Sequence, residues 1–399
     1  MKLYPNLIRA VVETLDDILI EGVYADKAIE RKLKTNKKWG ARDRHFIAST
    51  TYEIIRYKRL LLFLMPSRVK EEQLSQGLFK TWLWWKTNDL PDFPVLPLMS
   101  PDRLEAKLQE AEGKTEIKES VPDWLYKAIK ADYPKEYDAL LKALNTEADV
   151  VLRTNTLKTG KASLLKQLER DKVQAAIFDD SDALVLKRRT NVFRTKAFQR
   201  GLFEVQDRAS QEVAPFLQVS PGMQVIDACA GAGGKTLHLS ALMSAKGRII
   251  AMDTEDYKLA ELKIRARRAG AGNVETRQIE NSKVVKRLHG KADRLLLDVP
   301  CTGSGVLRRN PDSKWKMTPD FLNDIKAIQA DILNRYTKMV KPGGKLVYAT
   351  CSVLSSENRQ QVDRFINDHP EFELEEDRTL SPHTFGYDGF YMARLIRKA

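Results

Sequence analysis

The chain has 399 residues, 43% of them hydrophobic, and a formal net charge of +13. A single hydrophobic core rarely extends over so long a chain, so two or three domains are expected. The excess of lysine and arginine predicts a polyanionic partner, because these side chains release counterions from phosphates when they bind. The 3 cysteines are odd in number and lack zinc-ligand spacing, which excludes a disulfide framework and favours a reducing compartment without a metal ion.

The N-terminal segment does not read as a targeting or membrane-spanning sequence. Acidic residues interrupt "MKLYPNLIRAVVETLDDILIEG", and the longest early apolar run, Leu60 to Met65, is too short to cross a bilayer. We therefore expect a cytoplasmic protein with no membrane partner.

Apolar residues in the first third recur at intervals of three and four, which is typical of amphipathic helices. The pattern is clear in "LIRAVVETLDDIL" and again in "DRHFIASTTYEIIRYKRLLLFL". It predicts a helical domain over residues 1–144. Trp82, Trp84 and Trp85 in "TWLWWK" could stack on nucleic-acid bases, although aromatic residues in helices more often belong to a core.

The hydrophobic pattern of the sequence changes near residue 145. Two strand candidates, "DVVLRTNTL" and "ALVLKRR", flank the helical segment "KASLLKQLERD", which predicts a small α/β unit over residues 145–200. Its basic residues could line a nucleic-acid groove or simply form a solvated surface; they include Arg153, Lys187, Arg188, Arg189 and Arg194.

Strand and helix patterns alternate over residues 201–399. The strand candidates are "MQVIDACA", "GRIIAMDT", "DRLLLDVP" and "GKLVYATC". Alternation of this kind predicts an α/β fold with a mostly parallel sheet, helices on both faces, and ligands beyond the carboxyl ends of the strands. Asp227, Asp253, Asp298 and Cys351 stand at those ends and should gather on one rim.

A glycine-rich loop, "DACAGAGGKT", follows the first of these strands. Gly231, Gly233 and Gly234 permit tight turns and close backbone approach to a ligand, but their spacing fits neither a dinucleotide-binding motif nor a P-loop. Asp253, at the end of the next strand, could accept hydrogen bonds from two ribose hydroxyls. This combination suits S-adenosylmethionine, which has an adenosine but no phosphate; the alternative for Asp253 is a helix cap.

Two cysteines occupy strand ends. Asp298 and Cys301 share the rigid turn of "LLLDVPCTGSGVLRR", and Cys351 follows 50 residues later, so neighbouring rim positions could bring both thiols to one substrate. The turn "SVLSSEN" after Cys351 is expected to leave the sheet, with Ser355 or Ser356 and Glu357 capping the next helix.

The runs "DACAGAGGKT", "DVPCTGSGVLRRNPDSKW" and "YATCS" resemble the RsmB/Nop2/Sun family of RNA cytosine-5 methyltransferases. The resemblance covers residues 145–399, and the N-terminal "ADKAIERKL" and "RDRHFIASTTYEIIR" are similar to the NusB-like helical RNA-binding domain of the bacterial RsmB branch. It implies a class I S-adenosylmethionine-dependent methyltransferase fold with a Rossmann-like seven-stranded sheet. An RRM-like α/β unit and a NusB-like domain would precede this catalytic domain.

The resemblance also implies a division of labour between the thiols. Carbon 5 of cytosine is a poor nucleophile, so a thiolate must first add to carbon 6. The residues alone leave open which thiol attacks, since DNA cytosine methyltransferases use a Pro-Cys cysteine. The resemblance assigns the attack to Cys351 and product release to Cys301, places Asp298 against the cytosine edge, and gives Lys235 the task of holding that carboxylate or the base.

The cofactor contacts implied are Cys229, Ala230, Gly231, Gly233, Gly234, Lys235, Asp253, Glu280, Asn281 and Asp298. Members of the family usually carry an aspartate near the adenine amine, where this chain has "VETRQIENSKV", so Glu280 or Asn281 is expected to serve. For Cys229 the alternative is a small residue packed beneath the cofactor without a chemical role.

The function expected is methylation of carbon 5 of a cytosine in RNA, most simply 16S ribosomal RNA, by a monomeric enzyme. The alternatives are a transfer RNA substrate, a DNA substrate, or an RNA-binding ribosome assembly factor without catalysis. Intact Asp298, Cys301 and Cys351 argue against the last of these.

Overall fold

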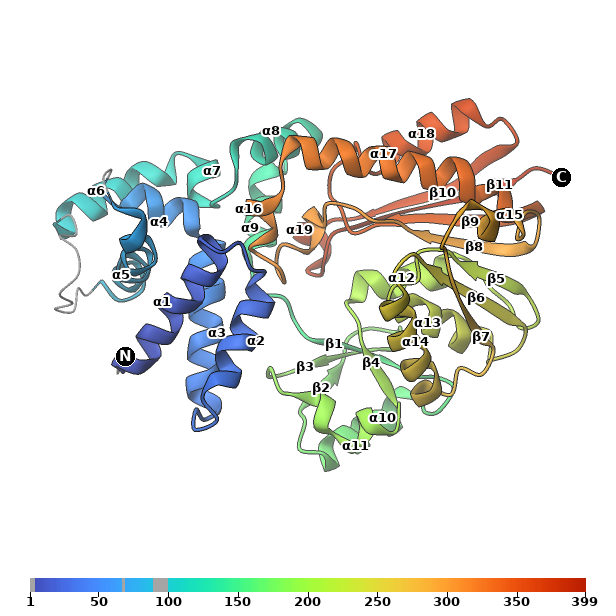
Figure 1. Ribbon diagram of the computed structural model, residues 1–399, viewed down its shortest axis with the longest axis horizontal. Coiled ribbons are helices and arrows are strands. Elements are labelled where there is room, and N and C mark those ends of the chain that lie inside the picture. The colour runs from blue at the N-terminus through green and yellow to red at the C-terminus, as the bar shows by residue number, and fades with distance from the viewer. Residues whose placement is uncertain (1–3, 67–68, 89–99) are drawn as a thin grey trace. The chain divides into compact units, whose positions relative to one another are not determined.

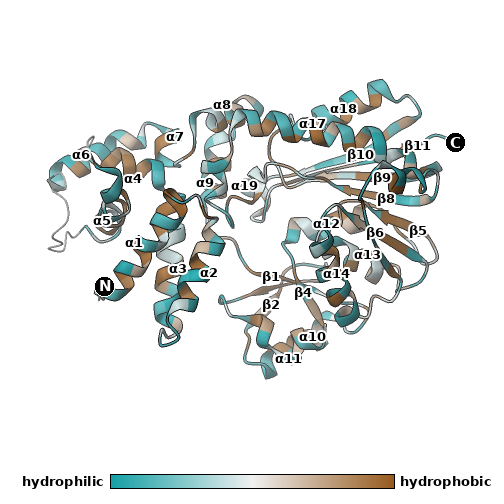
Figure 2. Ribbon diagram, in the orientation of Figure 1, coloured by the Kyte–Doolittle hydropathy of each residue, from teal (hydrophilic) through white to brown (hydrophobic). Residues whose placement is uncertain are grey.

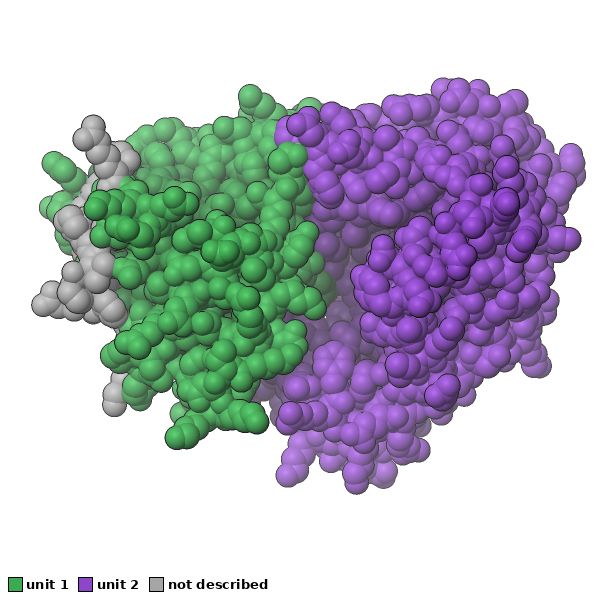
Figure 3. Space-filling view, in the orientation of Figure 1, with its two compact units in different colours: residues 1–146, 307–318 green, residues 147–306, 319–399 purple. Residues whose placement is uncertain are grey.

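The computed structural model describes residues 4–66, 69–88 and 100–399. The chain divides into two compact units, coloured separately in Figure 3. The first comprises residues 1–146 and 307–318, and the second comprises residues 147–306 and 319–399. The chain therefore leaves the second unit after Val306 and returns to it at Pro319.

The first unit is helical. Its helices are α1 (Pro5–Leu19), α2 (Ala25–Thr35), α3 (Ala41–Arg56), α4 (Lys58–Leu64), α5 (Leu74–Thr87), α6 (Pro101–Glu112), α7 (Thr115–Lys118), α8 (Asp123–Asp132), α9 (Tyr137–Asn145) and α16 (Ser313–Lys316), with a 3-10 turn, η1 (Glu71–Gln73). The apolar face that the spacing predicts is buried, as Val11, Leu15 and Ile47 illustrate. Trp82 and Trp84 are buried too, so they belong to the core and are not free to stack on bases. No helix in the part of the chain that the structure describes is long and apolar enough to cross a membrane.

Residues 307–318, which the sequence placed with the second unit, pack with these helices. The Trp315 indole Nε1 donates to the carbonyl of Ile55 at 2.7 Å. The buried Lys314 ammonium donates to Asn145 Oδ1 at 3.0 Å, and Asp312 Oδ2 accepts from the backbone amide of Ala25 at 3.0 Å. Hydrophobic periodicity carries no signal for such long-range anchoring.

A four-stranded antiparallel sheet opens the second unit, with strand order β2-β3-β1-β4. Its elements are β1 (Val151–Thr154), α10 (Lys161–Arg170), β2 (Ala175–Ile177), β3 (Ala183–Leu186), η2 (Val192–Arg194), α11 (Lys196–Gln199) and β4 (Phe203–Val205). Arg153, considered for a nucleic-acid groove, is instead buried. Its guanidinium donates to the Gln206 side chain and, at 2.6 Å, to the carbonyl of Gly234.

A seven-stranded sheet with order β10-β11-β9-β8-β5-β6-β7 forms the rest of the second unit (Figure 1). Its strands are β5 (Gln224–Asp227), β6 (Arg248–Asp253), β7 (Val274–Gln278), β8 (Ala292–Asp298), β9 (Val340–Thr350), β10 (Phe372–Leu380) and β11 (Phe390–Arg397). Strands β5 to β9 pair in parallel, whereas β11 runs antiparallel to both β9 and β10. The predicted α/β class with a mostly parallel, seven-stranded, Rossmann-like sheet is confirmed.

Helices cover both faces of this sheet (Figure 1). They are α12 (Arg208–Phe216), α13 (Gly234–Leu242), α14 (Asp256–Ala269), α15 (Ser282–Lys286), α17 (Pro319–Tyr336), α18 (Arg359–Asp368) and α19 (Pro382–Phe385), with the 3-10 turns η3 (Ser304–Val306) and η4 (Thr337–Met339). Successive residues of β8 serve opposite faces. Leu295 and Leu297 pack in the cluster that includes α17 and α18, and Leu296 packs in the cluster of α12 and α13. Burial on both faces explains why these strands read as continuous apolar runs, which colour brown in Figure 2.

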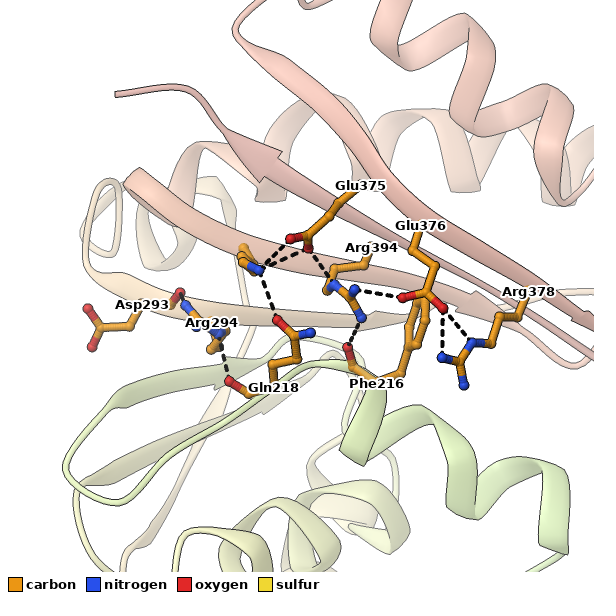
Figure 4. Close-up of polar contacts among 9 residues, drawn as sticks. Phe216, Gln218, Asp293, Arg294, Glu375, Glu376, Arg378 and Arg394 are labelled. Carbon is orange, nitrogen blue, oxygen red and sulfur yellow. Dashed lines mark hydrogen bonds and ion pairs between the residues drawn. The ribbon is translucent and has the colours of Figure 1, made fainter.

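Charged residues fix α12 to the antiparallel part of the sheet (Figure 4). Arg394 on β11 is buried, donates to the carbonyl of Phe216 at 2.9 Å, and forms ion pairs with Glu375 and Glu376 of β10. Lys345 of β9 joins the network through Glu375 at 2.6 Å. Each of the three guanidinium nitrogens thus makes a hydrogen bond, and the network holds strand and helix together.

Candidate active site

The carboxyl ends of four neighbouring parallel strands form one rim, as the alternation predicts. Asp227 ends β5, Asp253 ends β6, Asp298 ends β8, and Cys351 directly follows β9. The strand order places these four ends side by side, and the crevice outside such ends is where open α/β sheets bind ligands.

The glycine loop lies against Asp253. The backbone amide of Gly231 donates to Asp253 Oδ2 at 2.8 Å, and the amide of Glu255 donates to Asp253 Oδ1 at 3.0 Å. Gly233 has φ +88°, and a Cβ there would lie 2.5 Å from the Leu262 side chain, so only glycine fits. Gly231 also has a positive φ. A Cβ built at Gly231 would meet no atom within 4 Å, so there is room for a ligand beside this part of the loop.

Asp227 lies beneath this loop. It is buried, its Oδ2 accepts from Thr236 Oγ1 at 2.7 Å, and its Oδ1 has no partner among the described residues. Burial raises the pKa of Asp227 to about 7, and the neighbouring Asp298 carboxylate acts in the same direction. Because that oxygen is closed off from the surface, the raised pKa allows Asp227 to carry a proton near neutral pH.

Lys235 and Asp298 form an ion pair on the rim, with 2.6 Å between Lys235 Nζ and Asp298 Oδ2. Lys235 comes from the first turn of α13 and Asp298 from the end of β8, so the contact joins two segments 63 residues apart. The Lys235 ammonium also lies 5.1 Å from the centre of the Phe390 ring. One carboxylate oxygen is thereby held, while Asp298 keeps a second oxygen for hydrogen bonding.

The two rim cysteines face each other, with 3.3 Å between Cys301 Sγ and Cys351 Sγ. Both are partly buried free thiols. The hydrogen bond to Cys351 is the main reason that the pKa of Cys301 is raised well above its ordinary value, and burial adds to the effect. Either sulfur can donate in this contact, and the raised pKa favours the neutral thiol at Cys301.

Glu357 fastens the two cysteine loops together. Its side chain is fully buried and accepts from the backbone amide of Thr302 at 2.8 Å and from Thr302 Oγ1 at 2.6 Å. The hydroxyl of Ser352 and, at 3.1 Å, the Gln329 amide also donate to it. The residues after each cysteine thus share one carboxylate. The prediction that Glu357 caps the following helix is wrong, because its side chain turns inward and α18 begins after Asn358 without a side-chain cap.

Close backbone packing supports the same junction. The backbone amide of Gly305 donates to the carbonyl of Cys351 at 2.9 Å. The carbonyl of Gly305 accepts from the backbone amide of Gly389 at 2.8 Å. A Cβ at Gly305 would lie 2.2 Å from the Gly389 oxygen. The loops approach so closely that no larger residue fits there.

The remaining predicted cofactor residues lie around this rim without forming one cluster. Cys229 packs against the hydrophobic core, and burial raises its thiol pKa well above the ordinary value, which agrees with a packing role. Ala230 is a buried member of the glycine loop. Glu280 is exposed after β7, and the Asn281 side chain accepts from the amide of Lys283 at 3.0 Å as the cap of α15.

Two protein-family models match the chain. Residues 214–396 match the model described as 16S rRNA methyltransferase RsmB/F. Residues 121–193 match the ferredoxin-like domain of RsmF/B-like methyltransferases. The two matches account for the seven-stranded sheet and most of the four-stranded one.

Known proteins align over larger parts of the chain. Ribosomal RNA small subunit methyltransferase B of Yersinia pseudotuberculosis is 32% identical over 297 residues, which cover 69% of this chain and 66% of the relative. The crystal structure of PH0851 superposes with a TM-score of 0.80 at 24% identity and covers 99% of both chains. A methyltransferase homolog protein from Pyrococcus horikoshii gives a TM-score of 0.62 at 25% identity, covering 71% of this chain and 97% of the other.

Proposed function

Because the chain belongs to the RsmB/F family of methyltransferases, we propose that it methylates carbon 5 of a cytosine in RNA, with 16S ribosomal RNA as the substrate. The proposal rests above all on one observation: two free thiols 3.3 Å apart on the rim of a parallel sheet. A methyltransferase acting on an oxygen or an exocyclic nitrogen needs no such pair, whereas carbon 5 needs a nucleophile to activate it.

The residues present fit S-adenosylmethionine as the methyl donor. Asp253 is held by two backbone amides, and each of its oxygens retains a lone pair for a ribose hydroxyl. The open space beside Gly231 leaves room for the ligand along the glycine loop. When bound, S-adenosylmethionine supplies an electrophilic methyl group.

Cys351 is the proposed nucleophile. Its thiolate forms a bond to carbon 6, and the electron pair of the carbon 5 to carbon 6 double bond moves to carbon 5, which takes the methyl group. A base, which water can supply, then takes the proton from carbon 5. The electron pair left behind restores the double bond as the bond from carbon 6 to sulfur breaks and returns the Cys351 thiolate. The raised pKa of Cys301 fits a partner that stays protonated beside the leaving Cys351 sulfur and assists release.

Asp298 and Lys235 are proposed to position the base. A carboxyl at Asp298 can hydrogen-bond to ring nitrogen 3 and the exocyclic amine of cytosine, where charge develops when carbon 6 is attacked. The ion pair of 2.6 Å with Lys235 keeps that carboxyl aimed from the strand end.

Incubation with radiolabelled S-adenosylmethionine and 16S ribosomal RNA, followed by bisulfite mapping, tests the proposal. We expect one protected cytosine that is absent from RNA incubated without enzyme. Parallel incubation with transfer RNA and with duplex DNA separates the substrate classes. Label found on a ribose or on an exocyclic nitrogen would contradict the proposal.

A further inference from the structure

A basic pocket of about 590 Å³ lies within the second unit, where the loop before β4 meets the end of α14. We call it the junction pocket. Its lining residues are Lys158, Gln199, Arg200, Leu202, Arg267 and Arg268. Four of these six are cationic, and the lining contains no aspartate or glutamate from the described part of the chain. None of them belongs to the candidate active site.

Much of this positive charge is left unneutralised. The Lys158 ammonium donates to two backbone carbonyls, those of Arg200 at 2.9 Å and Arg268 at 2.7 Å, and not to a carboxylate. Arg268 pairs with Glu204 at 2.5 Å. The exposed guanidiniums of Arg200 and Arg267 form no ion pair within residues 4–66, 69–88 and 100–399. The guanidinium groups of Arg200 and Arg267 are therefore available to a ligand.

The walls of the pocket are fixed before any ligand arrives. The buried Asn155 amide donates to the carbonyl of Gly201 at 2.7 Å and to that of Ala269 at 2.8 Å, which ties the two walls together. Gly201 has φ +68°, and a Cβ there would lie 2.1 Å from the Arg268 oxygen. The backbone of the pocket is therefore preorganised, and the main conformational cost of binding is the ordering of the exposed arginine side chains.

The pocket is connected to the glycine loop through α14. Arg265, one turn before Arg268, donates to the carbonyl of Ala232 at 2.8 Å and pairs with Glu204 at 2.9 Å. Glu204 also holds Arg268. Arg268 in the pocket lining therefore lies one helical turn from a residue whose side chain contacts the glycine loop.

We propose that the junction pocket binds backbone phosphates of the RNA substrate through Arg200 and Arg267, an inference that rests on the proposed function. Planar guanidinium forks match phosphate oxygens in pairs. The lining offers no aromatic surface for stacking a base, and its one apolar residue, Leu202, is nearly buried, so the contacts are to the strand and not to its sequence.

The test is RNA binding as a function of salt. Fluorescence anisotropy is measured with a labelled 20-nucleotide oligocytidylate for the full chain, for the double variant R200A/R267A, and for a matched control, K291A/K338A. The control removes the same charge from exposed residues at the amino end of β8 and before β9, away from the rim. Loss of two phosphate contacts lowers the slope of log K against log salt by about 1.4 for a single strand.

We expect that decrease in R200A/R267A, with a similar decrease for an oligouridylate, and an unchanged slope in the control. Equal slopes in the two double variants would overturn the inference, as would a loss seen only with one base sequence. Circular dichroism melts check that both variants fold. Methyl transfer by the unmodified chain is measured alongside and separates the two proposals. A reduced slope in R200A/R267A without methyl transfer would support the phosphate site and contradict the proposed function. Methyl transfer with an unchanged slope in R200A/R267A would contradict only the phosphate site.

Discussion

The proposed cofactor side of the site and its thiol side are held in place by different kinds of contact. On the cofactor side, Asp253 is fixed by backbone amides of Gly231 and Glu255, which belong to the loops directly after β5 and β6. On the thiol side, Cys301 and Cys351 depend on the side chain of Glu357, which reaches across 55 residues of sequence to Thr302. Backbone contacts survive most substitutions, whereas a shared buried carboxylate does not.

This difference predicts that variants on the two sides fail in different ways. Changes on the cofactor side should weaken S-adenosylmethionine binding while the rate at saturation survives. Changes on the thiol side should lower the rate while cofactor binding survives.

The largest effect is expected for Cys351→Ala. Removing the nucleophile should lower methyl transfer by about 10⁴-fold or more, because the neighbouring thiol of Cys301 has a raised pKa and is therefore a poor source of thiolate. Turnover with labelled S-adenosylmethionine measures it, and a circular dichroism melt checks that the variant folds. Substantial methylation by Cys351→Ala would rule out this residue as the nucleophile.

Cys301→Ala should come next. The covalent RNA adduct should form but resolve slowly, so turnover falls by about 10³-fold. A shifted protein band on a denaturing gel reports the adduct, and the band should vanish in the double variant with Cys351→Ala. A variant that loses turnover without a band would show that Cys301 does not act in release.

Glu357→Gln tests the junction between the loops. The amide keeps the volume of the carboxylate but cannot accept from Thr302, Ser352 and Gln329 together, so a buried donor is left unpaired. We expect kcat to fall by roughly 100-fold and calorimetric S-adenosylmethionine affinity to stay the same. An equal loss of cofactor affinity would mean that the two sides are not independent.

Asp253→Asn is the opposite case. Replacing one acceptor oxygen with a donor should weaken S-adenosylmethionine binding by about 10-fold, equivalent to one charged hydrogen bond, with kcat at saturation little changed. Isothermal titration measures the affinity. Unchanged affinity would exclude Asp253 from the ribose contact.

The smallest effect concerns pH. The pKa of Cys301 is raised in the folded state, first by the hydrogen bond to Cys351 and then by burial, so the neutral thiol stabilises the fold below the ordinary thiol pKa. That stability is lost as pH rises above about 9, by up to about 1.4 kcal/mol per pH unit. Chemical denaturation from pH 8 to 10 should show a steeper decline for the unmodified protein than for Cys301→Ser. Parallel curves would contradict this assignment.

The hydrophobic pattern of the sequence predicted the α/β architecture, because a strand that is buried on both faces is a continuous run of apolar residues. Leu295, Leu296 and Leu297 read as one apolar run because both sheet faces are covered. The same reasoning placed Asp298 and Cys351 on one rim, since parallel strands end at the same edge. The expectation that Lys235 holds the Asp298 carboxylate or the base came instead from the family resemblance.

Other features of the structure could not be predicted from neighbouring residues in the sequence. "SSEN" has the composition of a helix cap, yet Glu357 turns inward because Thr302 and Ser352 offer it donors from other segments. Arg153 looked like one of several surface arginines, but the Gly234 carbonyl holds it in the interior. The junction pocket was equally invisible, because its arginines come from the end of α11 and the last turn of α14, which are far apart in the chain.

The amino-acid sequence by itself determined the strand and helix alternation, the glycine loop, and the residues at the strand ends, because each is set by neighbours along the chain. Tertiary structure alone decided that the two thiols lie 3.3 Å apart, that one buried glutamate joins their loops, and that residues 307–318 pack with the helical unit. Those outcomes depend on hydrogen bonds between distant segments, which the order of residues does not record.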